Sequence, residues 1–116
     1  PPRFVRERLA AEGVLTAADL RSVTDGERVR VAGVVTHRQR PPTAGGVTFV
    51  SLEDETGLVN VIVSKGCWAR HREVVVGAVA LVVRGRAEVA DGVVNIVAER
   101  LYPLSLAPPS RARDFR

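Results

Sequence analysis

The sequence predicts an all-β fold, a small barrel of five strands with one helix inserted between the third and the fourth strand. Valine occurs 22 times among the 116 residues, and β-branched residues at this density favour strands over helices. From Arg28 onward, apolar and polar residues alternate in short segments. Glycine, proline and Asp-Gly pairs separate those segments, as turns between strands require.

The first 27 residues predict a short helical lead-in to the barrel. Residues 3–12 are helix formers, and Gly13 stands where a helix commonly ends in a left-handed residue. Thr16 followed by Asp19 resembles a capping box that opens a second brief helix. Asp25 and Gly26 end that helix with a turn.

The barrel is expected over residues 28–102. Gly33 marks a bulge or bend in the long first strand, Asp91-Gly92 predicts a tight hairpin turn before the last strand, and 103–116 form a basic tail. The strands are expected at 28–40, 47–53, 58–64, 79–89 and 92–101, with a helix at 65–75.

Five antiparallel strands with a helix between the third and fourth are the arrangement of the OB-fold, a Greek-key barrel. A ferredoxin-like sandwich would need a helix between its first two strands, where the segment PPTAGG leaves no room. An SH3-like barrel stays open as an alternative, although it would not need the inserted helix.

Length and composition predict one globular domain. The chain is 46% hydrophobic and 26% charged, which excludes a disordered or collagen-like protein, and no apolar run is long enough to span a membrane. The single cysteine, Cys67, cannot form an internal disulfide, so the cytoplasm is the default location. The chain opens on Pro1-Pro2 with no leader pattern, which indicates a piece of a longer protein.

The basic charge is segmental. Sixteen arginines and one lysine oppose thirteen acids, for a net charge of +4. Residues 28–46 hold four arginines and no acid, whereas 47–64 sum to −3 and 65–87 to +4. Because the planar arginine side chain suits phosphate recognition, an anionic ligand is expected at the two basic stretches.

Alternation along the predicted hairpin of 47–64 sorts its side chains. Val50 and Leu52 face inward on one strand, as do the valines of LVNVIV on the next. Phe49 and Asn60 are then outward neighbours, with Ser51 beside them, on the face that OB-folds use for oligonucleotides. An exposed phenylalanine can stack on a base, and an asparagine amide can pair with a base edge. The alternative is an apolar surface residue covered by the N-terminal segment or a neighbouring domain.

Arginines on two other strands are candidate phosphate contacts. The first strand ends in His37, Arg38, Gln39 and Arg40, and a bulge would exchange its two faces, so alternation leaves open which of these side chains meet a ligand. Arg38 and Arg40 are the preferred candidates for phosphates. Arg84 and Arg86 share one face of the fourth strand and predict a second phosphate track, with Arg70 and Arg72 as weaker candidates.

The sequence predicts no active site, cofactor or metal in this chain. Glu53, Asp54 and Glu55 are interpreted as a turn flanked by acids rather than a metal site. His37 and His71 have no serine or cysteine arranged for nucleophilic catalysis, and Cys67 with Trp68 is interpreted as helix packing, Trp68 capping the open end of the barrel.

The residues resemble the C-terminal OB domain of bacterial C-family DNA polymerases. The resemblance lies in VAGVVTHRQRP and FVSLEDETGLVNVIV and covers about residues 14–116, while the ending SRARDFR is similar to the error-prone, ImuC-type branch of DnaE-like polymerases. It implies a parent polymerase that copies damaged DNA, with catalytic aspartates in a domain absent here. It also implies contact with single-stranded template DNA, and ImuA- or ImuB-type accessory proteins and the sliding clamp as partners of the parent.

FVSLED followed by LVNV is also similar to the anticodon-binding OB domain of aspartyl-type tRNA synthetases. In that family the phenylalanine stacks on a base and the polar residue reads one, roles that would fall on Phe49 and Asn60. Three functions therefore follow as hypotheses: single-stranded DNA binding, docking of accessory proteins through the outer face or the tail around Phe115, and RNA binding of the anticodon type.

Overall fold

The computed structural model describes residues 3–107, and the end of the predicted tail, with Phe115, lies outside them. Helix α1 (Arg3–Ala11), the two-residue strand β1 (Val14–Leu15) and the 3-10 helix η1 (Asp19–Ser22) form the lead-in. The capping box is confirmed: the Thr16 amide donates to the Asp19 carboxylate at 2.9 Å, and the Asp19 amide donates to the Thr16 hydroxyl at 3.1 Å. Gly13 ends α1 with a φ of 78°, as its place after the helix predicts.

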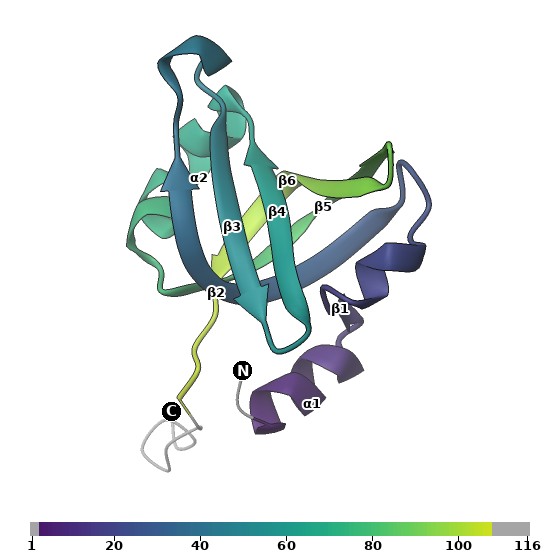
Figure 1. Ribbon diagram of the computed structural model, residues 1–116. Helices are drawn as coiled ribbons and strands as arrows, with labels where there is room; N and C mark the ends of the chain where they lie inside the picture. Colours follow the sequence, from purple (N-terminus) through teal and green to yellow (C-terminus); the bar gives the residue numbers. More distant parts are fainter. Residues whose placement is uncertain (1–2, 108–116) are drawn as a thin grey trace.

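Five long strands and one helix follow, as the sequence predicts. They are β2 (Arg28–Gln39), β3 (Thr48–Asp54), β4 (Gly57–Val63), α2 (Lys65–Gly77), β5 (Ala80–Ala90) and β6 (Val93–Pro103), with a 3-10 turn η2 (Pro42–Ala44) after β2. The sheet order is β1-β2-β3-β4-β6-β5, and β2 also pairs with β5, which closes the barrel. The OB-fold prediction is confirmed, including the helix between the third and fourth barrel strands (Figure 1).

Two details differ from the predicted all-antiparallel barrel. Strands β4 and β6 pair in parallel, which makes the barrel mixed. The small strand β1, absent from the prediction, adds to the edge of the sheet in parallel with β2. A two-residue strand carries too little alternation to be read from sequence.

The barrel core consists mainly of β-branched side chains, as alternation predicts. Val50 and Leu52 of β3 and Val59, Val61 and Val63 of β4 are at most 2% exposed. Helix α2 covers one end of the barrel with fully buried Cys67 and Val75, while Trp68 packs half-buried against the same core. Its first turn is capped by the Ser64 hydroxyl, which accepts a hydrogen bond from the Cys67 amide at 3.2 Å.

Strand β2 changes partners along its length. Its first part, from Arg28 to Val34, pairs with β5, and its second part, to Gln39, pairs with β3. A Cβ atom at Gly33 would lie 2.7 Å from the backbone oxygen of Glu53, so only glycine fits the crossing. The predicted bulge lies elsewhere: the register shifts between Val35 and His37.

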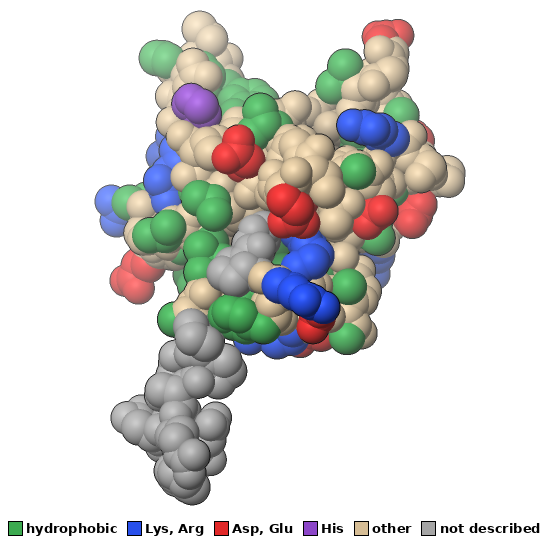
Figure 2. All heavy atoms as spheres, turned by 60° about the horizontal axis from the view of Figure 1, so that its bottom comes forward, with side chains coloured by type: hydrophobic (Ala, Val, Ile, Leu, Met, Phe, Trp, Pro, Cys, Tyr) green, Lys and Arg blue, Asp and Glu red, His purple; other side chains and the backbone are tan. Residues whose placement is uncertain are grey.

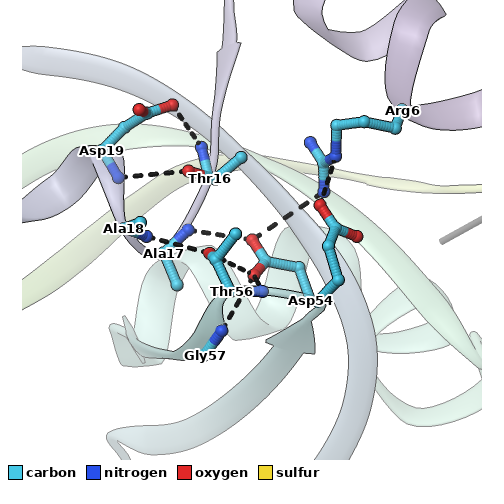
Figure 3. Close-up of polar contacts among 9 residues, drawn as sticks. Arg6, Thr16, Ala17, Ala18, Asp19, Asp54, Thr56 and Gly57 are labelled. Atoms are coloured by element: carbon cyan, nitrogen blue, oxygen red, sulfur yellow. Dashed lines mark hydrogen bonds and ion pairs between the residues drawn. The ribbon is translucent and has the colours of Figure 1, made fainter.

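The acidic turn has a structural role that ties the lead-in to the β3–β4 hairpin (Figure 3). Buried Asp54 accepts hydrogen bonds from the backbone amides of Ala17, Thr56 and Gly57 at 2.7–3.1 Å and from the Thr56 hydroxyl at 2.6 Å. Arg6 of α1 completes the contact with a 2.6 Å ion pair to Glu55. Because Asp54 accepts four hydrogen bonds at this junction, the turn and the lead-in are held as one unit.

Candidate nucleic-acid interface

The outward side chains of the β3–β4 hairpin form an exposed surface. Ser51 lies directly opposite Asn60, and Phe49 lies opposite Ile62, so Phe49 and Asn60 share the face one cross-strand pair apart. Phe49 is 42% exposed although its side chain is among the largest apolar ones of the chain. The β2–β3 connection and the β5–β6 turn extend on either side of this hairpin (Figure 1).

The second part of β2 adds to this surface. The register shift at Thr36 places His37 opposite Ser51 and Gln39 opposite Phe49. His37 is exposed and lies 3.2 Å from the Thr36 hydroxyl through its Nδ1 atom. We call this surface the hairpin face; it consists of His37, Gln39, Phe49, Ser51, Asn60 and Ile62.

Arg38 points to the opposite side of β2 from the hairpin face. It is paired with Val50, whose side chain is buried, and its guanidinium reaches helix α2. Nε donates to the Val75 carbonyl and Nη2 to the Ala78 carbonyl, each at 2.6 Å. These bonds satisfy carbonyl groups at the C-terminal end of α2, where a cation is favoured. Arg38 therefore anchors the helix to β2, whichever ligand the domain binds.

Arg40 contacts the ring that covers the barrel end. Its guanidinium carbon lies 4.9 Å from the centroid of the Trp68 ring, a cation–π geometry. The residue follows β2 directly, so it stands at the start of the β2–β3 connection. Arg40 thus follows Gln39 of the hairpin face in the chain, while its guanidinium contacts Trp68 of α2.

Strand β6 extends the hairpin face with residues that the sequence reasoning did not select. The parallel pairing places Asn95 beside Asn60 and Val97 beside Ile62. Two carboxamide side chains of the same kind therefore stand on neighbouring strands, each able to pair with a base edge. The repeated pattern of LVNVIV and VVNIVA was the available signal, but only the strand order shows that the two segments are neighbours.

Arg84 and Arg86 lie on a different wall of the barrel from Phe49. They belong to β5, where they pair with Arg30 and Arg28 of the first part of β2. Arg86 donates to the Gly26 carbonyl at 3.2 Å and lies 3.7 Å from the Glu99 carboxylate. The sequence-predicted site residues therefore divide into three groups: Phe49, Asn60, Ser51 and His37 on the hairpin face, Arg38 and Arg40 against α2, and Arg84 and Arg86 on β5.

Two titratable groups of α2, Cys67 and His71, are shifted toward their uncharged forms. Burial raises the pKa of the Cys67 thiol, against the opposing charges of Arg70 and Arg100. Burial also lowers the pKa of His71, and the positive charges of Arg100 and Arg70 lower it further. A buried thiol held protonated has the character of a packing residue rather than a nucleophile.

Among residues 3–107, three or more His, Cys, Asp or Glu side chains do not gather into a group that could hold a metal ion. No helix in this described part is long and apolar enough to cross a membrane. The underside of the barrel, where α1 packs, intersperses basic, acidic and apolar side chains (Figure 2).

This chain is similar over its whole length to error-prone DNA polymerases. The chain is 58% identical over 116 residues to the error-prone DNA polymerase of Mycolicibacterium paratuberculosis and 56% identical to that of Mycobacterium tuberculosis strain H37Rv. It is also 54% identical over 117 residues to that of Cutibacterium acnes. The whole chain is covered in each case, but it spans only 10–11% of the length of these relatives.

Solved structures of distant sequence share the fold. An asparaginyl-tRNA synthetase from Pyrococcus horikoshii superposes with a TM-score of 0.64 at 20% identity, covering 88% of this chain and 26% of that one. An OBody bound to hen egg-white lysozyme gives a TM-score of 0.55 at 22% identity, covering 72% of this chain and 83% of that one.

The family assignment agrees with the closed barrel, the inserted helix and the exposed hairpin. Residues 29–104 match the family described as an OB-fold nucleic acid binding domain. The chain belongs to this family of OB-fold nucleic acid binding domains, and its sequence corresponds to part of bacterial error-prone DNA polymerases.

Proposed function

We propose that this domain binds single-stranded DNA through the hairpin face, as a template-contacting module of an error-prone DNA polymerase. The observation that carries the proposal is Phe49, 42% exposed on the middle strand of an outward surface of an OB-fold. The whole-chain similarity to error-prone DNA polymerases favours DNA as the ligand.

Each side chain of the hairpin face has a part in this proposal. Phe49 stacks on a base, which is tolerant of sequence because every base has a π-face. Asn60 and Ser51, directly opposite each other, donate and accept hydrogen bonds at a base edge. His37 lies beside Ser51 and reaches the neighbouring nucleotide, while Arg40 meets a phosphate at the rim.

In the proposed parent enzyme, a DNA-directed DNA polymerase, the chemistry that extends DNA past damage belongs to other domains. Accessory proteins of the ImuA or ImuB type and the sliding clamp would be reached through that parent, in the cytoplasm. The domain's own task is to hold the unpaired template strand, without a cofactor or a catalytic residue.

Fluorescence anisotropy with a labelled oligothymidylate tests the proposal on the 116-residue chain. We expect the affinity to fall steeply with salt, because phosphate contacts release counterions. Phe49→Ala should weaken binding by about 1–3 kcal/mol, the value of one base–aromatic stack. Phe4→Ala is the matched control, since Phe4 is an exposed phenylalanine of similar exposure, 38%, on α1.

Wild-type protein that does not bind the oligonucleotide at low salt would contradict the proposal. If Phe49→Ala and Phe4→Ala lower the affinity for the oligonucleotide equally, the hairpin face is not the binding site. An RNA of the same length serves as competitor, and a structured transfer RNA that binds more tightly than single-stranded DNA would favour the anticodon-type function instead.

A further inference from the structure

Five arginines stand side by side on the wall of the barrel away from the hairpin face. In the antiparallel registers, Arg28 lies opposite Arg86, Arg30 opposite Arg84, and Arg84 opposite Arg100. All five side chains are exposed. We call this cluster the arginine ladder; it consists of Arg28, Arg30, Arg84, Arg86 and Arg100.

The ladder is unfavourable for the free domain. Like charges directly opposite each other on one face of a sheet destabilise the pairing. The ladder contains three such pairs, two between β2 and β5 and one between β5 and β6. Within residues 3–107, Arg86 alone among the five has an ion pair, with Glu99 at 3.7 Å. The five side chains point outward and do not pack in the barrel core, so core packing does not explain why these positions are arginines.

A groove of about 440 Å³ runs beside the ladder, and both arginines and carboxylates line it. Arg28, Arg30 and Arg84 line it together with Glu12, Glu27 and Glu99. Because the carboxylates offset the charge inside the groove, a small anion gains little there. A chain of phosphates lying across all five guanidinium groups gains more, since the ladder exceeds the groove acids by two charges.

An exposed aromatic side chain completes the surface. Tyr102 follows Arg100 by two residues on β6, is 45% exposed, and lines a second groove with Arg30 and Arg84. A basic surface with an adjacent exposed aromatic ring is typical of single-stranded nucleic-acid binding, where the ring stacks on a base. An acidic peptide would use the charges but would have no base to stack on the ring.

The ladder is continuous with the hairpin face around the barrel. Across the sheet, Ile62 of the hairpin face pairs with Val97 of β6, Val97 with Arg86 of β5, and Arg86 with Arg28 of β2. Neighbouring strands lie about 4.8 Å apart, so β5 is about 10 Å from β4. A strand that leaves the hairpin face over β6 therefore meets the ladder directly.

We propose that the arginine ladder, with Tyr102, is a second binding track for the phosphates and bases of the strand held on the hairpin face. The inference rests on the proposed function and extends it, because it predicts a longer binding site than the hairpin face alone provides. It assigns Arg84, which has an arginine on each side, as the central contact of this track.

Binding of oligothymidylates of about four and about sixteen nucleotides tests this proposal, since OB-folds have site sizes within this range. For the long oligonucleotide, Arg84→Gln should lower the affinity about three- to tenfold and reduce the salt slope by about 0.7, the value for one phosphate contact in a single strand. The affinity for the short one should stay within about twofold. Arg3→Gln is the charge-matched control, because the Arg3 side chain is 93% exposed and pairs with Glu7 on α1.

Variants of Tyr102 test the proposal independently of the arginines. Tyr102→Ala should weaken binding of the long oligonucleotide about fivefold or more, and Tyr102→Phe should restore it, because stacking needs the ring and not the hydroxyl. Thermal melting of each variant shows that it is folded, and Arg84→Gln should melt no lower than wild type at low salt, since it removes a repulsion. If Arg84→Gln melts lower, Arg28→Gln at the end of the ladder repeats the binding test.

The outcomes separate this proposal from the proposed function. Wild type that binds neither oligonucleotide contradicts the hairpin face itself. Wild type that binds both, with Arg84→Gln and Tyr102→Ala equal to wild type on the long one, overturns the ladder and leaves the hairpin face intact. A third outcome would also overturn the proposal. If polyglutamate binds wild type but not Arg84→Gln, and the oligonucleotide does not displace it, the ladder is a site for acidic peptides.

Discussion

The two parts of strand β2 use arginine in opposite ways. Before the register shift, Arg28 and Arg30 point outward, and their side chains have no hydrogen bond or ion pair within the described residues. After it, Arg38 points the other way and donates two 2.6 Å hydrogen bonds to carbonyls of α2 and the residue that ends it. The same residue type is therefore a candidate ligand contact on one part and a structural anchor on the other, and the bulge between them decides which.

Along β2, the largest effect is expected at the crossing where the strand changes partners. Gly33→Ala would place a Cβ atom 2.7 Å from the Glu53 oxygen and about as close to two more of its backbone atoms. Because backbone cannot move as a side-chain end can, we expect a loss of about 2–3 kcal/mol of unfolding free energy, measured by urea denaturation.

Gly45→Ala provides the comparison for Gly33→Ala. A Cβ atom at Gly45 would meet no atom within 4 Å, although its φ of 63° is left-handed. We expect a cost of about 1 kcal/mol there, from backbone strain alone. Equal losses at the two glycines would show that the crossing is looser than the distances imply.

The contrast between Arg38 and Arg30 gives the next effect in size. Arg38→Ala removes a charged donor from two carbonyls and should cost about 1–2 kcal/mol of unfolding free energy, since its partners regain only part of those bonds from water. Arg30→Ala should change stability by less than about 0.5 kcal/mol, because its side chain is exposed. Chemical denaturation of the two variants, made side by side, measures both, and a larger loss at Arg30 would reverse the roles assigned here.

Much of the fold could be predicted because its signals are local. Alternating valines identified the inward faces of β3 and β4, Thr16 with Asp19 identified the capping box, and Asp91-Gly92 identified the last hairpin turn, where both residues have positive φ. Each signal lies within a few residues of the structure that it specifies.

The remainder depends on contacts between distant segments. That Asn60 and Asn95 are neighbours can be predicted only when the strand order is known, because they lie on parallel strands distant in the sequence. The face of β2 on which Arg38 lies depends on the position of the bulge. A one-residue change in register moves every following side chain to the other face. Alternation could therefore select Phe49 and Asn60 within one hairpin but could not assign faces beyond the bulge.

A smaller effect is expected from the contact between Arg40 and Trp68. The 4.9 Å distance from guanidinium to ring centroid is worth about 0.5–1 kcal/mol at an exposed site. Arg40→Ala should lower stability by this amount. Trp68 is the one tryptophan of the chain, so its emission reports the change directly, and Arg28→Ala, remote from the ring on the ladder side, should leave the spectrum unaltered.

The smallest effect is electrostatic and connects the ladder to α2. Burial lowers the pKa of His71, and Arg100 of the ladder lowers it further, followed by Arg70. Because the folded state prefers the neutral ring, the unfolded chain takes up a proton first as the pH falls below about 6.5. The free energy of unfolding should therefore fall as the pH is lowered from about 6.5 to the folded-state pKa of His71. It should recover when the pH is returned to neutral.

Arg100→Gln isolates the contribution of the ladder to this titration. Removing one positive charge should raise the pKa of His71 toward its ordinary value and make the loss of stability on acidification smaller. An NMR titration of the His71 ring measures the pKa, and melting between pH 7.5 and 5.5 measures the linked stability. This range lies above the ordinary pKa values of Asp and Glu, so carboxylates contribute little to it. If Arg100→Gln leaves the pKa unchanged, the ladder does not act on α2, and burial with the charge of Arg70 accounts for the lowered pKa of His71.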